Sequence, residues 1–243
     1  MARKRILVFA TGGKTVEEGG GSGLQELVEF SRTTPPVLDA HIVGVVSNHQ
    51  NGSVADKARK LGVDFAYFCG PFIDFWYLDC IKRFDADFVM CSGWLKLVRG
   101  LDPHRTINIH PGPLPEFGGA GMYGHHVHEA VMAAYHRSEV YQSAVTMHFV
   151  DERYDHGPIL FQFPILIRED ETAETLARRV NEKERAWQAY ILNLIVHKRI
   201  WLEGSGPEDW EVFHTCPELA QYISGRLVSP GCEIHNHPSL LLK

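Results

Sequence analysis

The sequence predicts an α/β fold: a doubly wound, mostly parallel sheet with helices on both faces. Short apolar runs alternate with amphipathic stretches over the first two-thirds of the chain, and this alternation predicts strand–helix–strand units. Hydrophobic residues make up 44% of the 243 positions, which is enough to bury one substantial core. Sheets of this class bind ligands at the carboxyl ends of their strands, so candidate site residues are expected there.

The amino-terminal part supplies the first strands and helices. Compact apolar runs predict buried parallel strands at residues 6–10, 42–46 and 88–91. Amphipathic stretches predict helices between and beside them, at residues 24–31, 54–61 and 73–84. Basic residues precede the first run, as in a signal peptide, but the run is short and ends in glycines. We therefore interpret it as the first strand.

The remainder of the chain predicts further strands at 144–150 and 158–167, and then a long helix. The acidic cluster at 169–171 suits the start of that helix, because negative charge is favoured at a helix N-terminus. Residues 203–207 are rich in glycine, serine and proline and predict a linker. We therefore expect a main domain over residues 1–202, followed by a linker and short carboxy-terminal tail over 203–243.

Charge and cysteine content narrow the function classes. A net charge of −6 argues against a nucleic-acid partner, because such proteins usually carry a basic excess. The five cysteines are scattered, with no CxxC pair, which favours a reducing cytoplasmic location over a disulfide framework. No apolar run approaches the ~18–20 residues that span a membrane.

A glycine-rich loop follows the first strand, at 12–13 and 19–23. Glycines allow a backbone to approach a ligand closely, and Ser22 with Gln25 forms a capping-box pattern at the next helix. A helix N-terminus behind such a loop predicts anion binding, with a merely flexible loop as the alternative. Residues 13–15 resemble the end of a Walker A motif, but Val8 stands where its first glycine is required. A dinucleotide-binding GxGxxG motif is also incomplete: its last glycine would fall on Leu24 if the motif began at Gly19, and on Glu26 if it began at Gly21.

Three polar residues are candidates for catalysis. On a strand, Asn108 and His110 project from the same face, because side chains alternate with period two. Prolines follow directly and end that strand. Asp155 lies in a turn downstream, where aspartate is also common for purely structural reasons.

Together these motifs resemble the folate-dependent formyltransferase family. The shared pattern is Asn108-x-His110-Pro111, then Pro113-Leu114-Pro115, and later Asp155-His156-Gly157-Pro158. Three further segments resemble the phosphoribosylglycinamide (glycinamide ribonucleotide) formyltransferases of purine synthesis, namely residues 21–25, 117–124 and 181–184. The resemblance covers roughly residues 5–202 and implies formyl transfer from 10-formyltetrahydrofolate, with no metal, to the amine of glycinamide ribonucleotide.

The resemblance also implies a role for each residue. Asn108 would donate to the developing oxyanion, His110 would be the general acid, and Asp155 would orient His110 and raise its pKa. Gly21, Ser22 and Gly23 would hold the acceptor's phosphate, although the family usually has asparagine at the position of Gly23. The acceptor would contact Glu184 and Pro111. The folate would contact Leu95, Lys96, Leu97, Val98 and Asn108.

Other histidine clusters are weaker candidates. His125, His126 and His128 could be read as metal ligands, but residues one and three apart on a helix do not all share a face. Cys232, His235 and His237 lack a fourth ligand at recognisable spacing. We expect no metal at either cluster.

Three alternative functions remain open. A sugar-nucleotide N-formyltransferase or a formyltetrahydrofolate hydrolase would use the same three catalytic residues. The hydrolase usually carries an amino-terminal regulatory domain, whereas the first strand here starts near residue 5. A non-catalytic folate-binding protein is the third alternative, although all three reacting positions are filled. The sequence predicts no oligomeric state.

Overall fold

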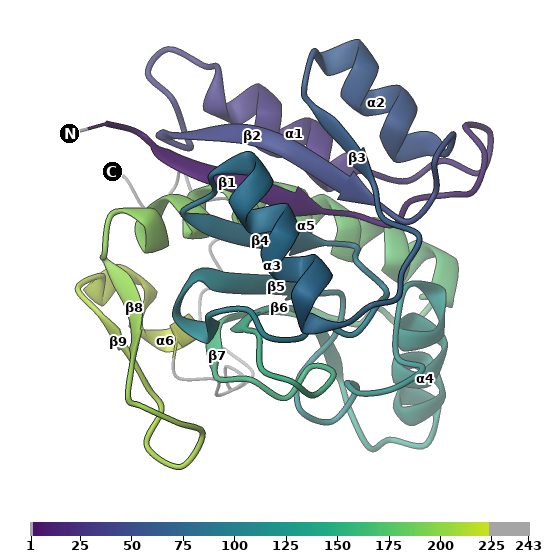
Figure 1. Cartoon of the computed structure of the whole chain (residues 1–243). Helices are drawn as coiled ribbons and strands as arrows, with labels where there is room; N and C mark the ends of the chain where they lie inside the picture. The colour runs from purple at the N-terminus through teal and green to yellow at the C-terminus, as the bar shows by residue number, and fades with distance from the viewer. Residues whose placement is uncertain (1, 224–243) are drawn as a thin grey trace.

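A seven-stranded sheet forms the centre of the molecule, in the order β3-β2-β1-β4-β5-β6-β7 (Figure 1). The computed structural model describes residues 2–223. The strands are β1 Lys4–Phe9, β2 Ala40–Ser47, β3 Phe65–Tyr67, β4 Phe88–Ser92, β5 Thr106–His110, β6 Gln142–Phe149 and β7 Ile159–Leu166. Strands β1 to β5 pair in parallel, and β6 runs antiparallel to both β5 and β7. The predicted mostly parallel sheet is confirmed.

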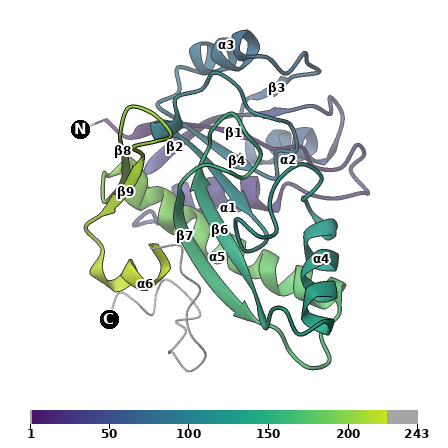
Figure 2. The same cartoon turned by 90° about the horizontal axis from the view of Figure 1, so that it is seen from below.

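Helices cover both faces of this sheet, as Figures 1 and 2 show. They are α1 Ser22–Ser31, α2 Ser53–Leu61, α3 Asp74–Phe84, α4 His125–His136 and α5 Ala173–Val196. Alternating residues of β1 divide between the two faces: Ile6 and Val8 join the core beneath α1 and α5, while Leu7 and Phe9 join a smaller core beneath α3. Burial on both faces explains why the parallel strands read as continuous apolar runs.

Two helix starts differ from expectation. Helix α1 has no side-chain cap, so the predicted Ser22 capping box is wrong; Gly21 precedes the helix with a left-handed φ of 74°. Helix α5 begins after the acidic cluster rather than in it. Its cap is Thr172, which shares a capping box with Thr175.

The chain continues after α5 into a small hairpin and a short helix. Strands β8 Ile200–Glu203 and β9 Glu211–His214 pair in antiparallel fashion, so residues 203–207, expected as a linker, form part of the hairpin turn. Helix α6 Ala220–Ile223 follows, and the Tyr222 ring packs against Phe161 and Trp187. The division at residue 202/203 stays a prediction, and Cys232, His235 and His237 lie outside the described residues.

Within residues 2–223, no helix combines the length and apolar character needed to cross a bilayer.

Candidate active site

Strand β5 places the first two catalytic candidates on one face of the sheet. Ile107 and Ile109 point into the core beneath α1 and α5, so Asn108 and His110, which alternate with them, face the opposite side. The neighbouring strand β6 pairs His148 with Asn108 and Thr146 with His110. The two strands therefore form one polar surface on this face of the sheet, made of Asn108, His110, Thr146 and His148. It lies next to the loops that follow β4, β5 and β6.

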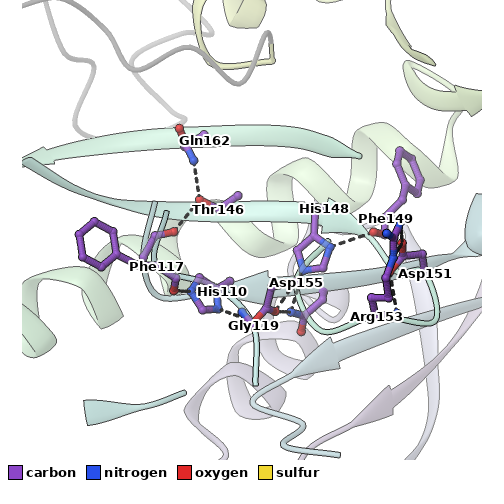
Figure 3. Close-up of polar contacts among 12 residues, drawn as sticks. His110, Phe117, Gly119, Thr146, His148, Phe149, Asp151, Arg153, Asp155 and Gln162 are labelled. Carbon is purple, nitrogen blue, oxygen red and sulfur yellow. Dashed lines mark hydrogen bonds and ion pairs between the residues drawn. The ribbon is translucent and has the colours of Figure 1, made fainter. Parts of the chain in front are cut away.

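Asp155 joins this surface from the loop between β6 and β7 (Figure 3). Its backbone is left-handed, with a φ of 53°, a conformation in which aspartate and asparagine are the best tolerated residues after glycine. One carboxylate oxygen lies 3.3 Å from Asn108 Nδ2 and 3.5 Å from His148 Nε2. The other accepts the Gly119 amide at 3.1 Å and lies 3.6 Å from His110 Nδ1. The structure thus brings all three sequence-predicted residues together.

The hydrogen bonds of His110 define its tautomer. Its Nε2–H donates to the Phe117 carbonyl at 2.8 Å, because a carbonyl can only accept. A second proton would therefore reside on Nδ1, facing Asp155. Burial lowers the pKa of His110 and outweighs the opposing effects of Asp155 and the Phe117 hydrogen bond. Asp155 acts to raise this pKa, as expected, but the net shift is downward because the ring is almost completely buried.

The pKa of Asp155 is lowered overall. Burial acts to raise it, but the neighbouring His148, His110 and Gly119 amide together exceed that effect. The carboxylate is therefore held ionised next to His110. This arrangement favours an imidazolium at the moment when His110 carries a second proton.

His148 is a site residue that sequence reasoning missed. It is buried, its Nδ1–H donates to the Phe149 carbonyl at 2.8 Å, and its Nε2 accepts from Asn108 Nδ2 at 3.0 Å. His148 thereby fixes the orientation of the Asn108 carboxamide. The available signal was alternation: Thr146 and His148 are polar positions in a strand whose intervening residues are apolar.

A second buried network supports the turn after β5. The Thr146 hydroxyl donates to the Gly112 carbonyl at 2.7 Å and accepts from Gln162 Nε2 at 3.0 Å. Gln162 also donates to the Leu114 carbonyl at 3.2 Å. These bonds tie the proline-rich turn to β6 and β7, and the same turn carries the Phe117 carbonyl that orients His110.

A cavity of about 510 Å³ opens beside these residues. It contains most of the sequence-predicted site residues: Gly21, Ser22, Gly23, Leu95, Asn108, His110, Pro111, Asp155 and Glu184. The remaining three, Lys96, Leu97 and Val98, line a neighbouring cavity of about 40 Å³. Because Asn108 and Asp155 line both cavities, the catalytic candidates lie between the two groups of predicted contacts.

Glu184 lies on α5 and faces the larger cavity. Burial raises the pKa of its carboxyl to about 7, with a small opposing effect from Asn181. The Asn181 Nδ2 donates to it at 3.4 Å. Near neutral pH this carboxyl therefore exchanges its proton readily, as suits a group that meets a polar or amine-bearing ligand.

Residues 21–23 of the glycine loop line the same cavity. A Cβ atom on Gly23 would lie 2.1 Å from the Ser92 hydroxyl oxygen, so this position has no room for a side chain. Gln188 fills the space instead, donating to the Gly23 carbonyl at 3.0 Å and accepting from Ser92 at 3.0 Å. Lys14, in the preceding part of this loop, is not among the residues that line the cavity.

The histidines at the start of α4 are divided between two environments. His125 and His126 are exposed and lie near Glu129, while His128 is buried. His125 and His128 both line the cavity. Burial lowers the pKa of His128 to about 4, so its ring is neutral at physiological pH. No cluster of three potential metal ligands occurs within the described part of the chain.

The fold and this site define a formyl transferase, and the chain belongs to that family: the family profile matches residues 4–193. The chloroplastic phosphoribosylglycinamide formyltransferase of Arabidopsis thaliana is 32% identical over 217 residues, which are 84% of this chain and 70% of the relative. The phosphoribosylglycinamide formyltransferase of Bacillus subtilis (strain 168) is 26% identical, with coverage of 79% and 95%.

Among solved structures, glycinamide ribonucleotide transformylase 1 from Symbiobacterium toebii is similar, with a TM-score of 0.69 and 26% identity. The similarity covers 83% of this chain and 92% of that one. The same particular enzyme is thus named for relatives found by sequence and by structure.

Proposed function

We propose that this protein transfers the formyl group of 10-formyltetrahydrofolate to the amine of glycinamide ribonucleotide in de novo purine biosynthesis. The observation that carries the proposal is the contact of Asp155 with Asn108 and His110 beside a cavity that a glycine loop and a helix N-terminus also line. The names of the relatives in Arabidopsis and Bacillus support the same acceptor.

The formyl-folate supplies an activated formyl carbon, which the acceptor amine attacks. Asn108 would then stabilise the oxyanion that develops on the formyl oxygen. Its Nδ2 donates to His148 Nε2 at 3.0 Å and to Asp155 Oδ1 at 3.3 Å. The oxyanion would replace Asp155 in the longer of these two hydrogen bonds. Such a donor is typically worth ~10²–10³ in rate.

His110 would act as general acid and, when protonated, as a positive charge beside the oxyanion. Asp155 faces its Nδ1 and would stabilise the imidazolium. The attacking amine must lose a proton and the leaving folate nitrogen must gain one. Either His110 itself or a water molecule would relay this proton from the amine to the folate nitrogen.

The two cavities would divide the substrates between them. Lys96, Leu97 and Val98 in the smaller cavity, with Leu95 beside it, would contact the folate. The loop of Gly21, Ser22 and Gly23 would receive the acceptor's phosphate. Glu184 and Pro111 would contact the rest of the acceptor. We propose these small molecules as the binding partners, in a reducing cytoplasm.

Release of tetrahydrofolate from 10-formyltetrahydrofolate tests the proposal. We expect release only when glycinamide ribonucleotide is added. Release without any acceptor would instead identify a hydrolase, and release with an amino-sugar nucleotide alone would identify a sugar-nucleotide N-formyltransferase. Folate binding without release for any acceptor would identify a binding protein.

A further inference from the structure

The larger cavity contains one strongly basic side chain. Among the described residues that line it, Arg185 of α5 is the one arginine or lysine. Its Nε lies 3.3 Å from a carboxylate oxygen of Glu26 on α1. Glu26 stands four residues after Ser22, so it lies about one helical turn behind the start of α1. Arg185 therefore lies beside the first turns of the helix that follows the glycine loop.

Glu26 anchors this arginine. The Glu26 side chain is about nine-tenths buried, and burial raises the pKa of its carboxyl while Arg185 opposes the rise. A buried carboxylate requires such a partner. Among the described residues, Glu26 is the one acidic side chain that pairs with Arg185. The planar fork of a guanidinium matches phosphate geometry.

Gln188 fixes the relative position of the two helices. It lies three residues after Arg185 and donates to the Gly23 carbonyl at 3.0 Å. Helix α5 thus contacts the start of α1 at two points, through Gln188 and through Arg185. Since Gly23 has no room for a side chain, this loop offers a ligand backbone amides and the Ser22 hydroxyl. A full positive charge has to come from elsewhere.

We propose that Arg185 is a specificity residue that binds the phosphate of the acceptor and is positioned by Glu26. The inference rests on the proposed function, because it assigns a further residue to the same acceptor site. The protein carries a net charge of −6, so a phosphate dianion needs a local cation. A helix N-terminus supplies only about half a unit charge. Arg185 supplies a whole one on the facing helix.

The first test compares KM for glycinamide ribonucleotide with KM for the corresponding nucleoside, which lacks the phosphate. R185Q is expected to raise KM for the ribonucleotide about 10- to 100-fold, the effect of a lost charge-assisted contact. Its KM for the nucleoside should stay unchanged. R178Q is the matched control, because Arg178 is exposed on the same helix and lies outside the cavity lining. An unchanged KM ratio in R185Q would overturn the proposal.

The second test measures binding of ribose 5-phosphate by calorimetry and needs no turnover. Wild-type protein and R178Q should bind it alike, and R185Q should bind it about tenfold or more weakly. If the wild-type protein formylates no acceptor but binds ribose 5-phosphate through Arg185, the proposed function fails and this inference stands. Equal affinity in wild type and R185Q contradicts the inference.

If R185Q does not fold, as judged by circular dichroism, R185M replaces it, because methionine removes the charge and keeps an unbranched side chain. About tenfold or weaker binding of ribose 5-phosphate by R185M supports the proposal, and wild-type affinity in R185M overturns it.

Discussion

Asp155 joins the catalytic candidates to one another at the scale of single residues. Its two carboxylate oxygens lie within 3.6 Å of polar atoms of Asn108, His110 and His148. Its left-handed backbone holds the carboxylate there. Asparagine also tolerates this conformation, so D155N removes the charge without forcing the loop to move.

Replacement of His110 or Asp155 should abolish most turnover. We expect H110A and D155N each to lower kcat by about a hundredfold or more, because each removes a group that acts on the developing charge. H126A is the control, since His126 is exposed and does not line the cavity. Steady-state rates with saturating substrates measure the effect. Near-normal turnover in either variant, with its fold intact, would exclude that residue from the mechanism.

Glu184 should make stability depend on pH. Its pKa is raised from 4.5 to about 7, so the folded state favours the protonated carboxyl, and stability is lost as pH rises from about 4.5 through 7. E184Q cannot titrate. The free energy of unfolding of E184Q minus that of wild type should therefore be about 1–2 kcal/mol larger at pH 8 than at pH 4. Urea titrations measure this difference, with exposed E182Q as control. A difference that does not change with pH would contradict the assignment.

At the scale of secondary-structure elements, tight packing fixes the start of α1. Ser92 at the end of β4 and Gln188 of α5 meet the Gly23 backbone. The first turn of α1, directly after the glycine loop, is therefore held by two other elements.

A side chain at position 23 should clash with that contact. G23A would place Cβ 2.1 Å from the Ser92 hydroxyl oxygen, and we expect a stability loss of about 1–3 kcal/mol. Adding S92A removes the obstructing oxygen and should recover part of the loss. A double-mutant cycle with S92A as the single control measures the coupling. Additive effects would show that the two positions do not meet.

The turn after β5 should depend on the Thr146 hydroxyl. T146V leaves the Gly112 carbonyl and one Gln162 hydrogen without their partner in a buried site, which should cost about 1–3 kcal/mol. T146S keeps the hydroxyl and should lose about 1 kcal/mol, the value of one buried methyl group. Chemical unfolding compares the two variants. Equal stability would mean that this network does not support the turn.

At the scale of the whole molecule, the sequence predicts the central sheet well because its strands are buried on both faces. Strand β3 has three residues at the sheet edge, too few for a periodic signal. The hairpin of β8 and β9 depends on its own turn and on β-strand pairing, and its glycines and proline suggested a linker. A local sequence pattern cannot distinguish a hairpin turn from a linker of the same composition.

The site residues also divide into those that a local sequence pattern predicts and those that it does not. The alternation of side chains along one strand is enough to predict that Asn108 and His110 lie on the same face. His148 is separated from Asn108 by 40 residues, and its role arises from the antiparallel pairing of β5 and β6. Likewise, the burial that lowers the pKa of His110 depends on loops that close over the ring. Such effects come from tertiary structure.

We propose that the cavity brings a formyl donor together with an amine acceptor. The most direct measurement follows a ¹³C label from the formyl group of 10-formyltetrahydrofolate by NMR, in the presence of glycinamide ribonucleotide. We expect the label to appear as the formamide of the ribonucleotide, and H110A to form this product far more slowly. Label that remains on the folate, or that appears as free formate with the ribonucleotide unmodified, would contradict the proposal.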